Sequence, residues 1–134
     1  MKYFYFYFFH GFEKCFKHCS NSFTVCINND QKVVSFGNSY YGGHGHKEED
    51  VFPPKIISSL NHIISISVGG DNCACLDNDG NVFIFGGNEY GQLGIGDKDL
   101  LHTSIPQKVN LPPCIQISCG YEFTMCLSES GEVY

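Results

Sequence analysis

The chain has 134 residues, a formal net charge of −6 and eight basic residues, all of them lysine. This length suits one domain with a modest hydrophobic core. Because phosphate neutralisation needs clustered cations and the lysines are scattered, the composition argues against direct DNA or RNA binding by this segment.

Residues 1–14 form an aromatic segment in which tyrosine and phenylalanine fill positions 3–9. A signal peptide would place small residues before a cleavage site, and these are absent here. A membrane span needs about 20 apolar residues, far more than this run supplies. We therefore interpret 1–14 as a strand of a preceding, degenerate repeat or as mistranslated upstream sequence, with a signal peptide as the less favoured alternative.

From residue 15 onward the chain repeats itself with a period near 50 residues. Residues 26–45 and 75–94 are identical at nine of 20 positions, and residues 64–83 and 115–134 are identical at eight of 20. Unrelated segments of ordinary composition would share about one or two. Fixed periods of this size are typical of stacked or radial architectures. We predict three units, at about residues 15–69, 70–120 and 121–134.

The middle unit shows the expected strands most clearly. Residues 64–68 alternate apolar and polar side chains, as a half-buried strand does. After two glycines, residues 73–76 form a second short apolar run. The sequence Asp77-Asn78-Asp79-Gly80 is a hairpin turn, in which the aspartates bond their own backbone. Residues 81–85, rich in Val, Ile and Phe, make a third strand.

A glycine-rich turn at residues 86–96 and a loop that carries Pro106 complete the unit, and no stretch shows helical periodicity. The fold class is therefore all-β, with three or four short strands in each unit. Glycine permits positive φ or close backbone approach, so the turn residues should be essential to the structure. These expected structural residues are Gly37, Gly42, Gly45, Gly69, Gly80, Gly86, Gly91, Gln92, Leu93, Gly94, Gly96, Gly120 and Gly131.

Eight cysteines could indicate a secreted disulfide scaffold, but their spacing follows the repeat. Cys26, Cys75 and Cys126 occupy one repeat position, and Cys19 and Cys119 occupy another. Equivalent positions on separate units lie too far apart to be bridged. We predict buried, reduced thiols that act as small hydrophobic residues. This indicates an intracellular protein of the cytoplasm or the nucleus.

Local motifs for catalysis or for cofactor binding are weak. The run 91–96 is glycine-rich like a phosphate loop, but no Lys-Ser/Thr and no helix follow it. The pair His44 and His46 lacks a Cys or a carboxylate at ligand spacing, and the Cys15-x-x-His18-Cys19 run is in phase with the repeat. We therefore expect no catalytic residue, no cofactor and no metal, and we predict that the chain is not an enzyme.

The remaining polar features have ordinary structural interpretations. His10, His62 and His102 are isolated, so we expect them in loops or on the surface. The charged cluster at residues 47–50 is best interpreted as a solvated loop tip, with a contact to a partner as the alternative.

Residues 81–97, with the core Tyr90-Gly91-Gln92-Leu93-Gly94-Ile95-Gly96, resemble the repeat of the regulator of chromosome condensation family. That repeat ends in Trp/Phe-Gly-x-Asn-x-x-Gly-Gln-Leu-Gly-x-Gly, and residues 115–134 match its first part. The resemblance extends over about residues 15–134. The first unit departs from it, because Gly43-His44 replaces Gln-Leu and Gln31 replaces the hairpin glycine.

The resemblance implies a seven-bladed β-propeller, so this chain would form an incomplete propeller, an arc of two to three antiparallel blades. It would be a fragment, a truncated gene product, or a chain that completes a propeller with another. The implied function is non-enzymatic protein–protein interaction through loops on a rigid ring. The alternatives are part of a guanine-nucleotide exchange factor for a small Ran-like GTPase, or a product without independent function. The expected partners are proteins, with self-association to cover open blade edges and no membrane.

Overall fold

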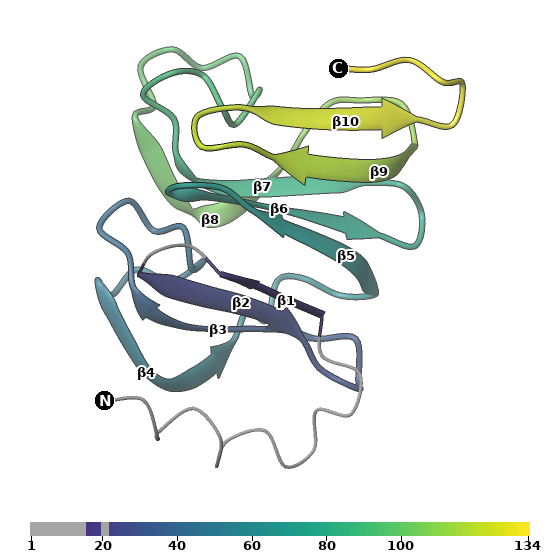
Figure 1. Cartoon of the computed structure of the whole chain (residues 1–134). Coiled ribbons are helices and arrows are strands. Elements are labelled where there is room, and N and C mark those ends of the chain that lie inside the picture. Colours follow the sequence, from purple (N-terminus) through teal and green to yellow (C-terminus); the bar gives the residue numbers. More distant parts are fainter. Residues whose placement is uncertain (1–15, 20–21) are drawn as a thin grey trace.

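The computed structural model describes the backbone of residues 16–19 and the backbone and side chains of residues 22–134, in three stacked antiparallel sheets (Figure 1). The predicted segment 1–14 lies outside the described residues. The first sheet has the order β1-β2-β3-β4 and the second β5-β6-β7-β8. Their bounds are β1 Phe16–Cys19, β2 Phe23–Ile27, β3 Val33–Asn38, β4 Asp50–Ile56, β5 Ile63–Val68, β6 Asn72–Asp77, β7 Val82–Gly87 and β8 His102–Lys108.

The third sheet contains β9 (Cys114–Cys119) and β10 (Thr124–Ser128), which pair antiparallel. Beyond β10 the chain turns back, and the backbone of Tyr134 exchanges hydrogen bonds with that of Cys126 at 3.0 and 2.9 Å. The predicted all-β class is therefore confirmed. The predicted unit boundaries fall in the turns that follow β5 and β9, and they stay a prediction.

The hairpin between β6 and β7 forms as its residues predict. The Asp77 carboxylate oxygen Oδ1 accepts the backbone N–H of Asp79 at 3.0 Å and that of Asn81 at 2.8 Å. Gly80 closes the turn with a φ of 81°, in the left-handed region that favours glycine. Asp77 thus acts through its carboxylate as a turn former, and no catalytic role is needed to explain it.

The segment around Pro106 differs from the prediction, because it is the strand β8 and not a loop. β8 is the outermost strand of its sheet, so only one of its sides pairs with a neighbour. The register with β7 also shifts between Ile84 and Gly86, opposite the part of β8 that holds Pro106. A proline without an N–H is tolerated at such a position.

The core consists of two apolar layers, one between each pair of adjacent sheets. Val25 and Ile27 of the first sheet belong to the same buried cluster as Ile66 and Cys73 of the second. A second cluster joins β6 and β7 to β9 and β10. Sheet-on-sheet burial of apolar side chains therefore holds the stack together.

The cysteines occupy this core, as their repeat spacing predicts. Cys26, Cys75 and Cys126 are at most 6% exposed, and none of the three forms a disulfide bond. Burial raises the pKa of Cys126 to about 11, which keeps this thiol protonated and unreactive at neutral pH. The prediction of buried, unbridged thiols is confirmed for five of the six described cysteines, and the sixth, Cys119, is unbridged but half-buried. The Cys15-x-x-His18-Cys19 side chains lie outside the described residues.

Among the described residues, no helix has the length and hydrophobicity that crossing a bilayer requires.

Two glycines at the same end of the molecule should tolerate substitution very differently. A Cβ at Gly86 would lie 2.1 Å from the Asp71 carbonyl oxygen, and the φ there is 110°. At Gly91 the φ is 80° but nothing lies within 4 Å. We expect Gly91→Ala to cost about 1–2 kcal/mol in free energy of unfolding and Gly86→Ala about 3 kcal/mol or more. Urea denaturation of both variants measures this, and equal losses would contradict the packing described here.

Candidate interaction site

The turn after β7 is built by side chains that bond its backbone. Asn88 Nδ2 donates to the Leu100 carbonyl oxygen at 2.7 Å, and Asn88 Oδ1 accepts the N–H of Leu93 at 3.1 Å. Gln92 Oε1 accepts the N–H of Tyr90 at 2.9 Å. Leu93 is 1% exposed and anchors the turn in the core. The sequence motif therefore acts as a scaffold that fixes where Tyr90 lies.

The structure places the expected structural residues in three groups. Gly69 and Gly120 have ordinary φ values but lie close together, since a Cβ on Gly69 would be 2.3 Å from the Gly120 carbonyl oxygen. Gln92 and Leu93 belong to the turn described above. That all of these residues are essential for stability stays a prediction. The glycines with positive φ are Gly37, Gly42, Gly45, Gly80, Gly86, Gly91, Gly94, Gly96 and Gly131.

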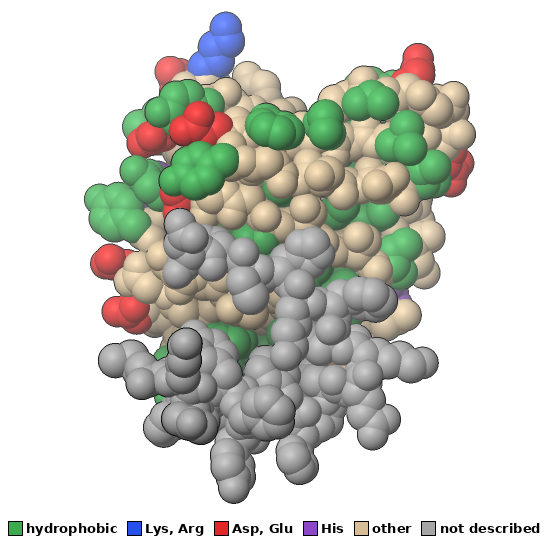
Figure 2. All heavy atoms as spheres, viewed as in Figure 1, with side chains coloured by type: hydrophobic (Ala, Val, Ile, Leu, Met, Phe, Trp, Pro, Cys, Tyr) green, Lys and Arg blue, Asp and Glu red, His purple; other side chains and the backbone are tan. Residues whose placement is uncertain are grey.

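Tyrosines from all three sheets are exposed on the turns at one edge of the molecule. Tyr40, Tyr90 and Tyr121 are 73%, 67% and 68% exposed. In Figure 2, hydrophobic and acidic side chains gather along the left edge, where Figure 1 shows these turns. A shallow pocket of about 140 Å³ lies among them. We call its six tyrosine and acidic side chains the tyrosine–carboxylate surface: Tyr41, Asp71, Glu89, Tyr90, Tyr121 and Glu122.

The tyrosine–carboxylate surface is electronegative. Its three carboxylates have no lysine or arginine among the residues that line the pocket. The negative charge of Glu89 raises the pKa of the Tyr41 phenol, with Asp71 adding to the effect. Tyr41 also packs edge-on against Tyr40, at 5.3 Å between ring centroids. Aromatic faces beside carboxylates suit a partner with cationic side chains.

Sequence analysis missed this surface, and a signal for it exists. Asp71 and Glu122 both stand just after the glycine turn of their unit, at the same repeat position. Tyr121 precedes Glu122 in that turn, whereas Gly70 precedes Asp71. Residues that vary within a repeat, at a turn whose backbone is constant, point outward from the scaffold. Inspection of the turn positions that carry tyrosine or a carboxylate in more than one unit would have found Tyr41 with Tyr90 and Asp71 with Glu122.

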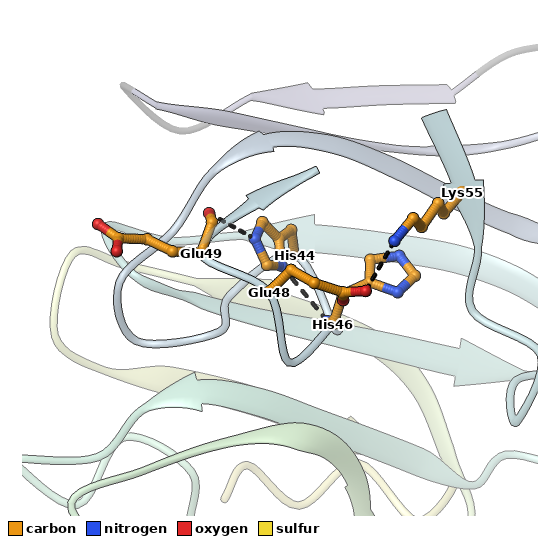
Figure 3. Close-up of polar contacts among 5 residues, drawn as sticks. All are labelled: His44, His46, Glu48, Glu49 and Lys55. Atoms are coloured by element: carbon orange, nitrogen blue, oxygen red, sulfur yellow. Dashed lines mark hydrogen bonds and ion pairs between the residues drawn. The ribbon is translucent and has the colours of Figure 1, made fainter. Parts of the chain in front are cut away.

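The loop of the first unit uses a histidine where the second unit uses a leucine. His44 occupies the repeat position of Leu93 and is 0% exposed. Its Nε2 lies 3.1 Å from the Glu49 carbonyl oxygen, and its Nδ1 accepts the N–H of His46 at 3.3 Å (Figure 3). Ser35 Oγ donates to the His44 carbonyl oxygen at 2.5 Å. His44 is thus a core residue with both ring nitrogens engaged.

The other polar candidates are structural as well. Within residues 22–134, no three His, Cys, Asp or Glu side chains form a group that could hold a metal ion. The loop tip 47–50 is exposed, as predicted, and Lys55 Nζ pairs with Glu48 Oε1 at 2.8 Å (Figure 3). His62 and His102 are exposed, whereas His10 lies outside the described residues.

Comparison with known proteins finds repeats of one family. Two sequence profiles described as "Regulator of chromosome condensation (RCC1) repeat" match residues 63–92 and 79–127. The mouse (Mus musculus) serine/threonine-protein kinase Nek9 is 29% identical over 125 residues. That match covers 86% of this chain and 12% of the kinase, so the chain spans about an eighth of this relative.

Solved structures share the fold. Human WBSCR16 superimposes with a TM-score of 0.78 at 22% identity, over 88% of this chain and 31% of that one. Yeast RCC1 (Prp20) bound to Kap60 gives 0.79 at 19% identity, over 89% and 31%. Prp20p from Saccharomyces cerevisiae, in a structure reported with its binding to Gsp1p and histones, gives 0.72 at 23% identity, over 92% and 31%. The three stacked sheets thus match part of these β-propellers.

The loop of the first unit should make stability depend on pH. Burial lowers the pKa of His46 below 6.5, and the nearby His44 and Lys55 add to the effect while Glu48 opposes it. Below that pH the unfolded state binds a proton that the folded state rejects, so this contribution to stability falls as pH falls. We expect the urea midpoint to drop between about pH 7 and pH 5, and to drop less in His46→Gln. An identical drop in both proteins would rule out His46 as a source.

Proposed function

We propose that this chain, which carries repeats of the regulator of chromosome condensation family, is a non-enzymatic segment of a β-propeller that binds a partner protein. The contact would be made by the tyrosine–carboxylate surface. The observation that carries this proposal is that Tyr41, Tyr90 and Tyr121, on turns of three successive sheets, line one shallow pocket, with Tyr90 and Tyr121 67% and 68% exposed.

The physics of interfaces supports this assignment. Tyrosine is enriched among the residues that dominate binding energy, because it buries a large area at a small cost in conformational entropy. Here each ring is held by a turn whose backbone is fixed from within, as Gln92 fixes that of Tyr90. Such preorganisation lowers the entropy lost on binding. The three carboxylates add a preference for a partner whose contact region is basic.

A small GTPase is the second candidate partner. It is favoured by one observation: the Prp20p structure, which shares this fold, was reported with binding to Gsp1p and histones. This chain covers 31% of that protein, so exchange activity would need surfaces that lie outside it. A chain with no independent function is the third alternative. We also place the chain inside the cell, in the cytoplasm or the nucleus, because none of its described cysteines forms a disulfide bond.

The binding surface is tested by a double substitution. We expect Tyr90→Ala with Tyr121→Ala to weaken binding at least about tenfold, because truncated interface tyrosines typically cost more than 1 kcal/mol each. The probes are purified core histones and a Ran-type GTPase, measured by biolayer interferometry. The control is Ile105→Ala, an exposed apolar position (54%) on β8. Unchanged binding of a probe by the double variant would place the contact elsewhere, and a chain that binds neither probe would favour a product without independent function.

Exchange activity has its own test. We expect this chain to leave the release of fluorescent GDP from the Ran-type GTPase unaccelerated, since it spans under a third of the Prp20 structures. Stopped-flow fluorescence at a large excess of the chain gives the rate. Faster release would replace the interaction proposal with the exchange-factor alternative.

A further inference from the structure

The pocket within the tyrosine–carboxylate surface has a buried floor and exposed walls. Gly87 and Gln92 form the floor, where Gly87 is buried and Gln92 is 9% exposed. The six side chains that define the surface form the walls. The volume of about 140 Å³ is well below the roughly 300–1,000 Å³ of sites for drug-sized ligands. The pocket therefore has room for one chemical group of a larger partner.

Gly87 leaves a vacant position in this floor. A Cβ there would lie 3.6 Å from Asp71 Cβ, 3.6 Å from Gln92 Nε2 and 3.8 Å from Tyr41 Cβ, which are ordinary contact distances. Gly87 is also absent from the glycines with positive φ. Its counterpart in the first unit is Asn38. Neither the backbone nor the repeat thus requires glycine here, and the effect of the glycine is an open space that three side chains surround.

Gln92 presents a hydrogen-bond donor to this space. Its Oε1 accepts the Tyr90 N–H at 2.9 Å, so Nε2 is the amide atom next to the vacant position at Gly87. Within residues 22–134, this Nε2 donates no hydrogen bond. A largely buried amide donor without an acceptor is unfavourable. A ligand that brings an acceptor to Nε2 would remove this cost.

The carboxylates of the pocket make the opposite demand. Asp71 borders the vacant position at Gly87, and Glu89 and Glu122 belong to the exposed walls. Among the described residues, the one ion pair joins Lys55 to Glu48. All three carboxylates of the pocket are therefore without a cationic partner, and they favour a ligand that carries positive charge.

Few groups in proteins meet both demands within so small a space. The side chains of lysine and arginine carry hydrogen-bond donors and no acceptor, so they would leave Gln92 Nε2 unpaired. The first residue of a polypeptide has both features. Its α-ammonium group is cationic at neutral pH, and its carbonyl oxygen, an acceptor, is separated from that group by a single Cα.

We infer that this pocket captures the free amino terminus of a partner chain, with the α-ammonium group at the carboxylates and the first carbonyl oxygen at Gln92 Nε2. The inference rests on the proposed function, because it names the group by which the tyrosine–carboxylate surface holds its partner. The tyrosine rings add a further attraction for the ammonium group. Capture of an amino terminus is a recurring mode of peptide recognition. Acetylation of the partner's amino terminus removes the charge and would release it.

Three short peptides test the inference on the 134-residue chain. The probe is the tetrapeptide amide of alanine, glycine, serine and glycine with a free amino terminus. The second peptide is its N-acetylated form, and the third is also N-acetylated but has lysine in place of alanine. NMR spectra of the ¹⁵N-labelled protein follow the backbone N–H of Gly87 and the side-chain N–H groups of Gln92. We expect the free peptide to shift these signals and the other two peptides to leave them in place.

Two outcomes of the titrations contradict the inference. The first is an absence of shifts with the free peptide, or equal shifts with its N-acetylated form. The second is an equal response to the lysine peptide, which would assign the pocket to a lysine side chain.

Matched variants locate the peptide within the pocket. Asp71→Asn should weaken binding of the free peptide about tenfold, because the ammonium group loses a charge-assisted hydrogen bond. The control Glu129→Gln removes the same charge at the opposite end of β10 from Glu122 and should change nothing. Gly87→Ala should abolish the shifts and keep the urea midpoint, because the added Cβ makes only ordinary contacts. Equal binding by Asp71→Asn and Glu129→Gln, or normal binding by Gly87→Ala, would overturn the inference.

Failure of this inference can be told apart from failure of the proposed function. Suppose that the double substitution of Tyr90 and Tyr121 weakens binding of a protein probe but the free peptide does not shift Gly87. The proposed function then stands, and the inference about the amino terminus is wrong. If the free peptide binds as expected but the double variant binds the protein probes unchanged, the pocket is supported and the protein contact lies elsewhere.

Discussion

Burial of one sheet's apolar face by the next sheet is the interaction on which the rest of this structure depends. No sheet here has a core of its own. Val25 and Ile27 are buried only because β5 and β6 lie over them, and Ala74 and Leu76 because β9 and β10 do. Stability in such an array is the sum of weak units and of the interfaces between neighbours. The interfaces must therefore be alike, and the residues that form them recur in the sequence with the period of the repeat.

The glycines allow the sheets to stack closely enough to bury one another's apolar faces. Sheets that stack this closely leave no room for a side chain where one backbone meets the next, as between Gly69 and the Gly120 carbonyl oxygen. Elsewhere a positive φ reverses the chain within a few residues, so the connections stay at the edge of the stack. Once Asn88, Gln92 and Leu93 have fixed a turn from within, its remaining side chains no longer affect the fold. Tyr90 is free to carry function for this reason.

The sequence predicts the structural features that recur with its period and misses several that depend on tertiary placement. The strands, the turn at Asp77 and the cysteines all follow the period, and these predictions are confirmed for the described residues except at Cys119, which is half-buried. The strand at Pro106 was not predicted, because proline argues against a strand. Only its placement on the edge strand of a sheet makes this proline acceptable. His44 was considered as a metal ligand, although its register with Leu93 marks it as a core residue. Comparison of the copies would have shown this, because the position and not the residue type determines burial.

The tyrosine–carboxylate surface could not be derived in the same way, although Tyr41 matches Tyr90 and Asp71 matches Glu122 in the repeat. Tyr41, Asp71 and Tyr121 come from three different sheets, and their proximity follows from the stacking of turns and not from their spacing in the chain. The two demands on the sequence are separated by place: buried strand residues pack sheet on sheet, and exposed residues at the turns are available to a partner. The surface through which the chain would distinguish one protein from another must then be sought among the exposed residues of these turns.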